Sequence, residues 1–242
     1  MNLVVMQLTS RALLGRRRSL LLLILPLVLL ALAALVRWTA DGAPEVSASV
    51  TSDFAIGTAL PLLCLLIGTG VIGPEIDDGS IVYLLAKPVP RWRILVSKLA
   101  VALAATVVLA VLPIVVGTAL AGDDGLRLTT AFGVGALLAG IAYTTIFVAL
   151  STVTRNAVVV GLLYALVWES LLGGFVPGVR NVSVRQWALA SSERLLGDDA
   201  ARFGVDSAVS MTAGWVLLAV VSAGATWIAI SRLRTLRLTG AD

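Results

Sequence analysis

Six long apolar blocks constrain the fold of this chain of 242 residues more than any other feature. The blocks are Ser19–Val36, Phe54–Ile72, Ile94–Ala121, Thr129–Leu150, Ala157–Val176 and Ala208–Ser231. A helix needs about 20 apolar residues to cross about 30 Å of hydrocarbon, and its backbone polar groups cannot stay unpaired in lipid. Charged residues make up only 13% of the chain. The sequence therefore predicts an all-α integral membrane protein with six transmembrane helices.

The positions of the positive charges predict the orientation of these helices. With six crossings both termini lie on one side of the membrane, and 12 of the 18 Lys and Arg residues fall on that side. Because positive charge collects on the cytoplasmic side, we expect both termini in the cytoplasm and a multi-pass protein of the plasma (inner) membrane. The cations flank the spans, so they favour contact with anionic lipid headgroups of the bilayer and not with nucleic acid.

The sequence predicts a single transmembrane domain, residues 1–242, with three segments outside the predicted spans. Residues 1–18 form an N-terminal membrane-surface segment, 73–93 a cytoplasmic loop, and 177–207 an external segment before the last span. The last of these mixes charged and apolar residues, which fits a short helix at the outer interface. Three arginines, residues 16–18, precede the first apolar block as in a secretory signal, but five further spans favour an uncleaved first helix.

The chain lacks the residue types on which most catalytic and metal sites depend. It has no histidine and a single cysteine, Cys64, which excludes serine–histidine hydrolysis and multi-cysteine metal sites. The only lysines, Lys87 and Lys98, do not belong to a G-x-x-x-x-G-K-[ST] phosphate loop. We therefore expect a non-catalytic membrane subunit with no catalytic residue, no metal and no cofactor in this chain.

Glu169 is the one carboxylate clearly at membrane depth in the predicted spans. A charge in hydrocarbon is costly, so such a residue usually faces a cavity, a partner helix or a pore. One interpretation makes Glu169 part of a substrate or ion pathway. The other makes it a neutralised or paired carboxyl near the external interface, since the block ends at Val176. The sequence leaves both open.

The 73–93 loop is charged and interrupted by prolines, although spanning a bilayer requires no such segment. Asp77 and Asp78 suit the start of a short helix, where carboxylates meet free N–H groups. Three apolar residues then share one face at helical spacing: Ile81, Leu84 and Leu85. Pro88 ends that helix, and Pro90 suits the first turn of the next one. The loop is therefore predicted to hold a short amphipathic helix and a hinge, and to contact something outside the membrane.

The same loop resembles that of type-2 ATP-binding-cassette (ABC) exporter permeases. The family pattern is approximately E-x-x-x-G-[ST]-x-x-x-L-L-x-x-P-x-x-R, followed by a lysine at the start of the next span. The matching residues are Glu75, Gly79, Ser80, Leu84, Leu85, Pro88, Arg91 and Lys98. One departure is Pro74, where the family more often has a small or polar residue. The six-span layout and the basic C-terminal tail also fit the type-2 ABC exporter permease fold.

The resemblance implies a permease that forms the translocation pathway of an ATP-driven exporter. It implies a dimer, either with a second copy or with a sister permease, bound to cytoplasmic ABC ATPase subunits that carry ATP and Mg. Residues 177–207 would include elements of an outer gate. The residues that would couple to the ATPase are Glu75, Asp77, Asp78, Gly79, Ser80, Leu84, Leu85, Pro88 and Arg91.

Two other classes of function stay open on the sequence. The first is a self-sufficient secondary transporter or channel without an ATPase, for which Glu169 would be the pathway residue. The second is an integral membrane enzyme or a scaffold subunit. The mostly apolar spans favour a hydrophobic or amphiphilic cargo for any transporter, but the residues do not identify it.

Overall fold

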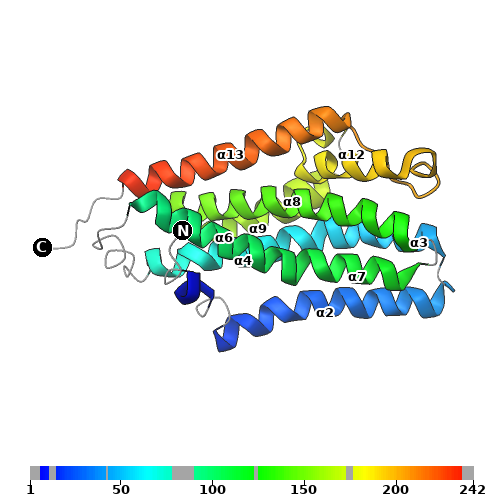
Figure 1. Ribbon diagram of the computed structural model, residues 1–242, viewed down its shortest axis with the longest axis horizontal. Coiled ribbons are helices and arrows are strands. Elements are labelled where there is room, and N and C mark those ends of the chain that lie inside the picture. Colours follow the sequence, from blue (N-terminus) through cyan, green and yellow to red (C-terminus); the bar gives the residue numbers. More distant parts are fainter. Residues whose placement is uncertain are drawn as a thin grey trace, which may run out of the picture.

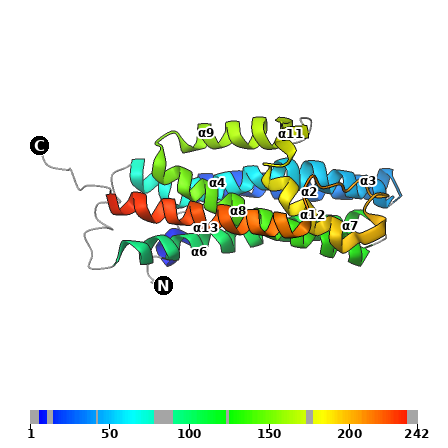
Figure 2. The same cartoon turned by 90° about the horizontal axis from the view of Figure 1, so that it is seen from above.

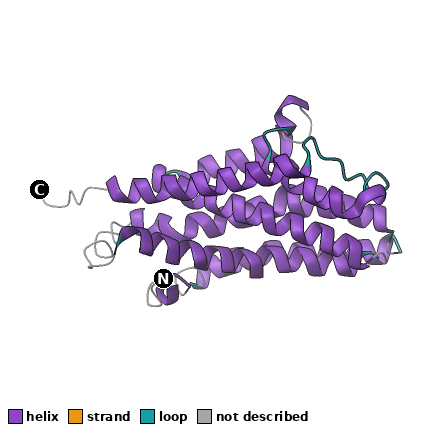
Figure 3. Cartoon of the chain, turned by 45° about the horizontal axis from the view of Figure 1, so that its top comes forward, coloured by secondary structure: helices purple, strands orange, loops and turns teal. Residues whose placement is uncertain are grey.

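The computed structural model describes residues 6–10, 15–41, 43–77, 90–122, 125–172 and 177–235, and they form an elongated bundle of helices (Figure 1). Figure 3 shows helices joined by loops, with no strand among these described residues. The first part of the chain contains α2 (Arg16–Thr39), α3 (Pro44–Ser49), η1 (Val50–Ala59), α4 (Leu60–Asp77), α6 (Arg91–Thr106), η2 (Val107–Val111) and α7 (Leu112–Ala121). The second part contains α8 (Gly125–Val153), α9 (Ala157–Leu163), η3 (Tyr164–Leu172), α11 (Pro177–Arg180), α12 (Val184–Leu196), η4 (Gly197–Asp199) and α13 (Met211–Thr235).

Five of the predicted spans are helices long and apolar enough to cross a membrane. They are Leu22–Thr39, Pro44–Ile76, Arg91–Ala121, Leu126–Val153 and Met211–Leu233. The block predicted at residues 157–176 corresponds to a shorter apolar helix, Ala157–Leu172, because residues 173–176 lie outside the described part of the chain. A multi-pass, all-helical protein is thus confirmed, and the sixth span stays a prediction.

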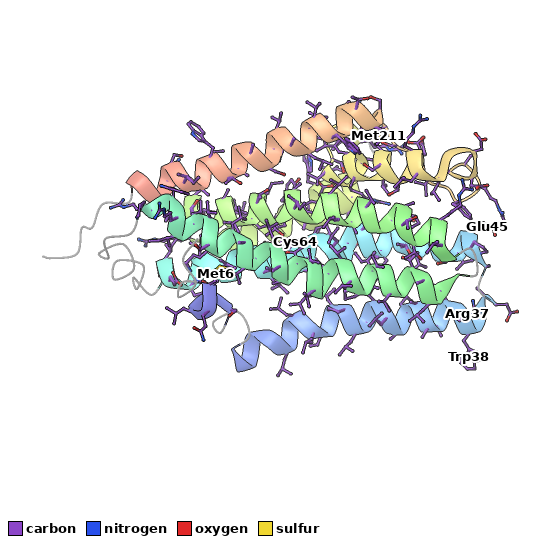
Figure 4. All side chains as sticks on the ribbon, viewed as in Figure 1. Met6, Arg37, Trp38, Glu45, Cys64 and Met211 are labelled. Atoms are coloured by element: carbon purple, nitrogen blue, oxygen red, sulfur yellow. The ribbon has the colours of Figure 1, made fainter. Side chains whose placement is uncertain are left out.

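The described ends of the chain lie toward the same end of the bundle. Residues 6–10 and the last turn of α13 lie toward this end, which we call the terminal end, and α3 and η4 lie at the opposite, distal end (Figure 1). In Figure 4 Met6 marks the terminal end, Cys64 the middle of the bundle, and Trp38 and Glu45 the distal end. This arrangement is what an even number of crossings requires. The prediction that the terminal end is cytoplasmic rests on the charge pattern alone.

Helix α8 is the centre of the bundle and packs against α4, α7, α12 and α13. In lipid, apolar burial excludes no water, so close packing and polar contacts hold helices together. Gly68 of α4 allows such packing, since a Cβ there would lie 2.8 Å from Cβ of Phe147 on α8. The hydroxyls of Thr106 and Thr144 add a buried hydrogen bond of 2.8 Å between α6 and α8. Figure 2 shows α9 along one side of this bundle.

The helix expected within residues 177–207 is present as α12. Helix α12 packs between α8 and α13, and most of its residues are buried. The Ser192 hydroxyl donates to the Ala131 carbonyl of α8 at 2.9 Å, and Ser191 accepts from the Trp215 indole of α13 at 2.8 Å. Small and polar side chains allow helices to approach closely and to bond each other in lipid. The expected position of this helix at the outer membrane interface stays a prediction.

Candidate functional site

The predicted coupling residues divide into those that the structure describes and those that it does not. Six of them lie outside the described residues: Asp78, Gly79, Ser80, Leu84, Leu85 and Pro88. The amphipathic helix predicted there is therefore untested. Asp77 is the last residue of α4, and Glu75 and Arg91 flank the undescribed segment on α4 and α6. These two side chains show how the ends of the 73–93 loop attach to the bundle.

Glu75 forms an ion pair with Lys98 of α6. The Lys98 Nζ lies 2.6 Å from Glu75 Oε1, and the side chains are 2% and 29% exposed, respectively. The same Nζ donates to the carbonyl of Val71, one turn before Glu75, at 2.8 Å. A positive charge is favourable near a helix C-terminus, where the backbone carbonyls carry partial negative charge. Lys98 therefore fastens the last turns of α4 to α6 by a charge and a hydrogen bond.

Arg91, at the other end of the loop, is attached to a different helix. Its Nη1 donates to the carbonyl of Leu233, near the end of α13, at 2.8 Å. The last carbonyls of a helix have no partner within it, so an arginine satisfies one of them and complements the helix dipole. The loop thus has two anchors: Glu75 is tied to α6 and Arg91 to α13.

Apolar packing joins the helices that carry these two anchors. A second core cluster at the terminal end brings together α4, α6, α8 and α13; its buried members include Ile72, Leu95, Val148, Ala229 and Leu233. Met6, from the N-terminal segment, packs against this cluster. Closely packed side chains transmit displacement with little compression. A displacement of the loop would therefore be passed to several long helices together.

Glu169 lies buried in the core of the protein, outside the 73–93 loop. Its carboxylate is fully buried and accepts four hydrogen bonds: from the hydroxyls of Tyr164 (2.8 Å) and Ser183 (2.6 Å), and from the backbone N–H groups of Val184 (3.0 Å) and Arg185 (3.3 Å). It therefore caps the N-terminus of α12, where free N–H groups and the positive dipole end stabilise a carboxylate. This geometry fits the interpretation of Glu169 as a partnered carboxyl, and a pathway role stays a prediction.

Some partners in these sites could not have been assigned from the sequence. Lys98 was part of the family pattern, but nothing in the pattern says that it faces Glu75. Ser183 and Tyr164 had no signal beyond residue type, because the π-helical turns of η3 set the five-residue spacing between Tyr164 and Glu169. Among the described residues there is also no group of three or more His, Cys, Asp or Glu side chains that could hold a metal ion.

Comparison with known proteins agrees with the resemblance of the loop. A family model described as "ABC-2 family transporter protein" matches residues 11–186. No curated protein matches the chain. The matched residues extend from the N-terminal segment to the start of α12, so they include the 73–93 loop with both of its anchors, and Glu169.

Proposed function

The chain belongs to the ABC-2 family of transporter proteins, and on this premise we propose that it is the transmembrane permease subunit of an ATP-driven exporter, coupled to a separate ATPase through its 73–93 loop. Family membership makes the protein a multi-pass membrane component of an ABC transporter. The coupling, the outward direction of transport and the plasma-membrane location belong to the proposal. So do ATP and Mg, which we place on the partner ATPase.

The observation that carries the proposal is the anchoring of the loop at both ends. Glu75 is bonded to Lys98 on α6, and Arg91 is bonded to the end of α13. A soluble partner that binds the loop and moves it would shift α4 with α6, and α13 with both. A loop without a mechanical role would need no attachment to two separate long helices.

The energy for such a movement would come from the partner. A change between inward- and outward-open states requires a ligand that binds one state more tightly than the other, and about 5.5 kcal/mol moves an equilibrium from 1:99 to 99:1. ATP would supply this by closing the ATPase dimer while the dimer holds the loops of two permeases. Because Lys98 of α6 pairs with Glu75 of α4, these two helices would move together.

A second permease is part of the proposal, as a second copy of this chain or as a sister protein. The face of α9 and η3 that points away from the bundle is apolar and exposed. Its side chains Val159, Leu163 and Leu171 each have more than half of their surface accessible. We expect the partner permease on this face. A translocation pathway between two permeases would then be bordered by these helices.

Co-purification tests the proposal directly. The tagged chain would be extracted in mild detergent from its native membranes, and proteins recovered in stoichiometric amounts would be identified by mass spectrometry. We expect a soluble ATPase with a phosphate-binding glycine loop, whose hydrolysis rate changes when the permease is removed. Recovery of the chain alone from several detergents, with transport activity kept in liposomes without ATP, would instead establish the self-sufficient transporter.

A further inference from the structure

A polar cavity of about 560 Å³ lies at the side of the bundle where η1, η3, α11, α12 and the segment after η4 meet. Two arginines and two aspartates are among its lining residues: Asp53, Arg180, Arg185 and Asp206. The cavity is separate from the 73–93 loop and from the anchors at the terminal end. A polar cavity of this size, partly open to solvent, calls for an explanation in a protein with 59% apolar residues.

Arg185 is held in the cavity wall by the helix behind it. Its guanidinium lies against Gly57 of η1, since a Cβ at Gly57 would come within 3.1 Å of Cζ and Nη1. A larger residue at position 57 would therefore force the guanidinium to shift. Its Nη2 donates to Asp53, and its side chain is 11% exposed. Its Nε is buried and has no hydrogen-bond acceptor in the described part of the chain.

Arg180, on α11, also pairs with an aspartate and also has an Nε without an acceptor among the described residues. Its Nη2 donates to the carbonyl and to the carboxylate of Asp206, both at 3.3 Å. Its Nε is also buried without an acceptor among the described residues. A buried donor that lacks an acceptor is destabilising, and such groups are uncommon in native proteins. Two of them lie on arginines of one cavity, and no described residue uses either donor.

Both aspartates that pair with these arginines are largely exposed to solvent. The side chains of Asp53 and Asp206 are 71% and 76% exposed, so water solvates each carboxylate. An ion pair contributes little to stability when the arginine is also in contact with solvent, as in the Arg180–Asp206 pair, whereas Arg185 is largely buried beside Asp53. A ligand anion can therefore displace them, because the aspartates lose little when they turn to solvent.

We propose that this cavity binds a phosphate group, as a free phosphate or as the headgroup of a lipid, through Arg180 and Arg185. A phosphate offers several oxygens to two guanidinium groups at once, and arginine's planar fork matches this geometry. Gln186, which also lines the cavity, adds a side-chain amide. The inference goes beyond the proposed function and does not depend on the ATPase.

Isothermal titration of the full-length chain in a neutral detergent tests the proposal with two separate probes, inorganic phosphate and dioctanoyl phosphatidic acid. We expect saturable binding of at least one. Binding of inorganic phosphate would identify a site for free phosphate, and binding of phosphatidic acid alone would identify a headgroup site. Absence of saturable binding for both probes would overturn the proposal.

Three variants decide whether the cavity is the site. Arg180→Gln should weaken binding at least about tenfold, because a hydrogen bond to a charged group contributes about 1.5–3 kcal/mol. Asp206→Asn should tighten binding, since it removes the competing carboxylate, and misfolding cannot produce that result. Arg202→Gln is the matched control: Arg202 pairs with Glu45 at 3.1 Å, both side chains are about half exposed, and neither lines the cavity. Equal affinity of the wild type, Arg180→Gln and Asp206→Asn would overturn the proposal.

Discussion

Lys98 and Glu75 form a partly buried ion pair at the base of the 73–93 loop, with 2.6 Å between Nζ and Oε1. The Lys98 side chain is 2% exposed, which places a charge where apolar packing would otherwise be expected. Taking a charge out of water costs several kcal/mol, and the pair repays this only with good geometry and further hydrogen bonds. The bond from Lys98 to the Val71 carbonyl is one of these. A pair of this kind is weak evidence for stability and better evidence for a specific connection between α4 and α6.

This connection yields a prediction with two readouts. Glu75→Leu should lower the free energy of unfolding by about 3–5 kcal/mol, because it leaves the charge of Lys98 buried and unpaired. Lys98→Met should lower it by less, because the Glu75 side chain is 29% exposed and water can solvate its charge. The double variant should recover most of this loss but still uncouple ATP hydrolysis from transport. Unfolding in detergent and transport in liposomes with the ATPase provide the two measurements. A double variant that transports as well as the wild type would contradict the coupling role.

Arg91 should behave differently from its neighbour Arg93. Arg91→Gln removes the bond to the Leu233 carbonyl and should lower the free energy of unfolding by about 1.5–3 kcal/mol, the contribution of a hydrogen bond to a charged group. It should also reduce ATP-driven transport, since α13 loses its link to the loop. Arg93→Gln is the control, because Arg93 lies over the exposed Trp92 ring at 5.4 Å. Equal transport by both variants would argue against a role for the anchor on α13.

Measurements of stability and of transport can decide whether Glu169 is a partnered structural carboxyl or a residue of the transport pathway. Glu169→Gln should lower the free energy of unfolding by about 1–3 kcal/mol, because an amide has one acceptor oxygen where the carboxylate has two for four donors. Tyr164→Phe, which removes one of those donors, should cost about 1 kcal/mol. A Glu169→Gln variant of unchanged stability that no longer transports would favour the pathway role instead.

The expected permease interface can be tested with engineered cysteines. In a Cys64→Ala background, Leu163→Cys on α9 should form a disulfide-linked dimer in native membranes if the chain is a homodimer. Leu27→Cys on α2 is the control, since the two leucines are similarly exposed (59% and 62%). A disulfide needs Cα atoms within about 7 Å, so cross-linking reports on close contact. Cross-linking through α2 and not α9 would place the interface on the other face.

The bundle itself was predictable, but several contacts within it were not. Long apolar blocks predicted the helices, since lipid demands internal backbone hydrogen bonds wherever the chain crosses. The mixture of residues in 177–207 predicted a helix, but composition does not say that α8 and α13 lie on either side of it. The polar cavity was not predictable from the sequence, because Asp53 and its partner Arg185 lie 132 positions apart.

The sequence by itself determined the class of this protein, its helices and its family, because hydrophobic length and the pattern of the 73–93 loop are local properties of the chain. Only the tertiary structure decided which side chains meet. Lys98 faces Glu75, Arg91 reaches the end of α13, and Glu169 caps α12 because of how the helices are rotated and offset against one another. Those rotations follow from packing between segments distant along the chain, where a shift of one residue turns a helix by about 100° and separates such partners.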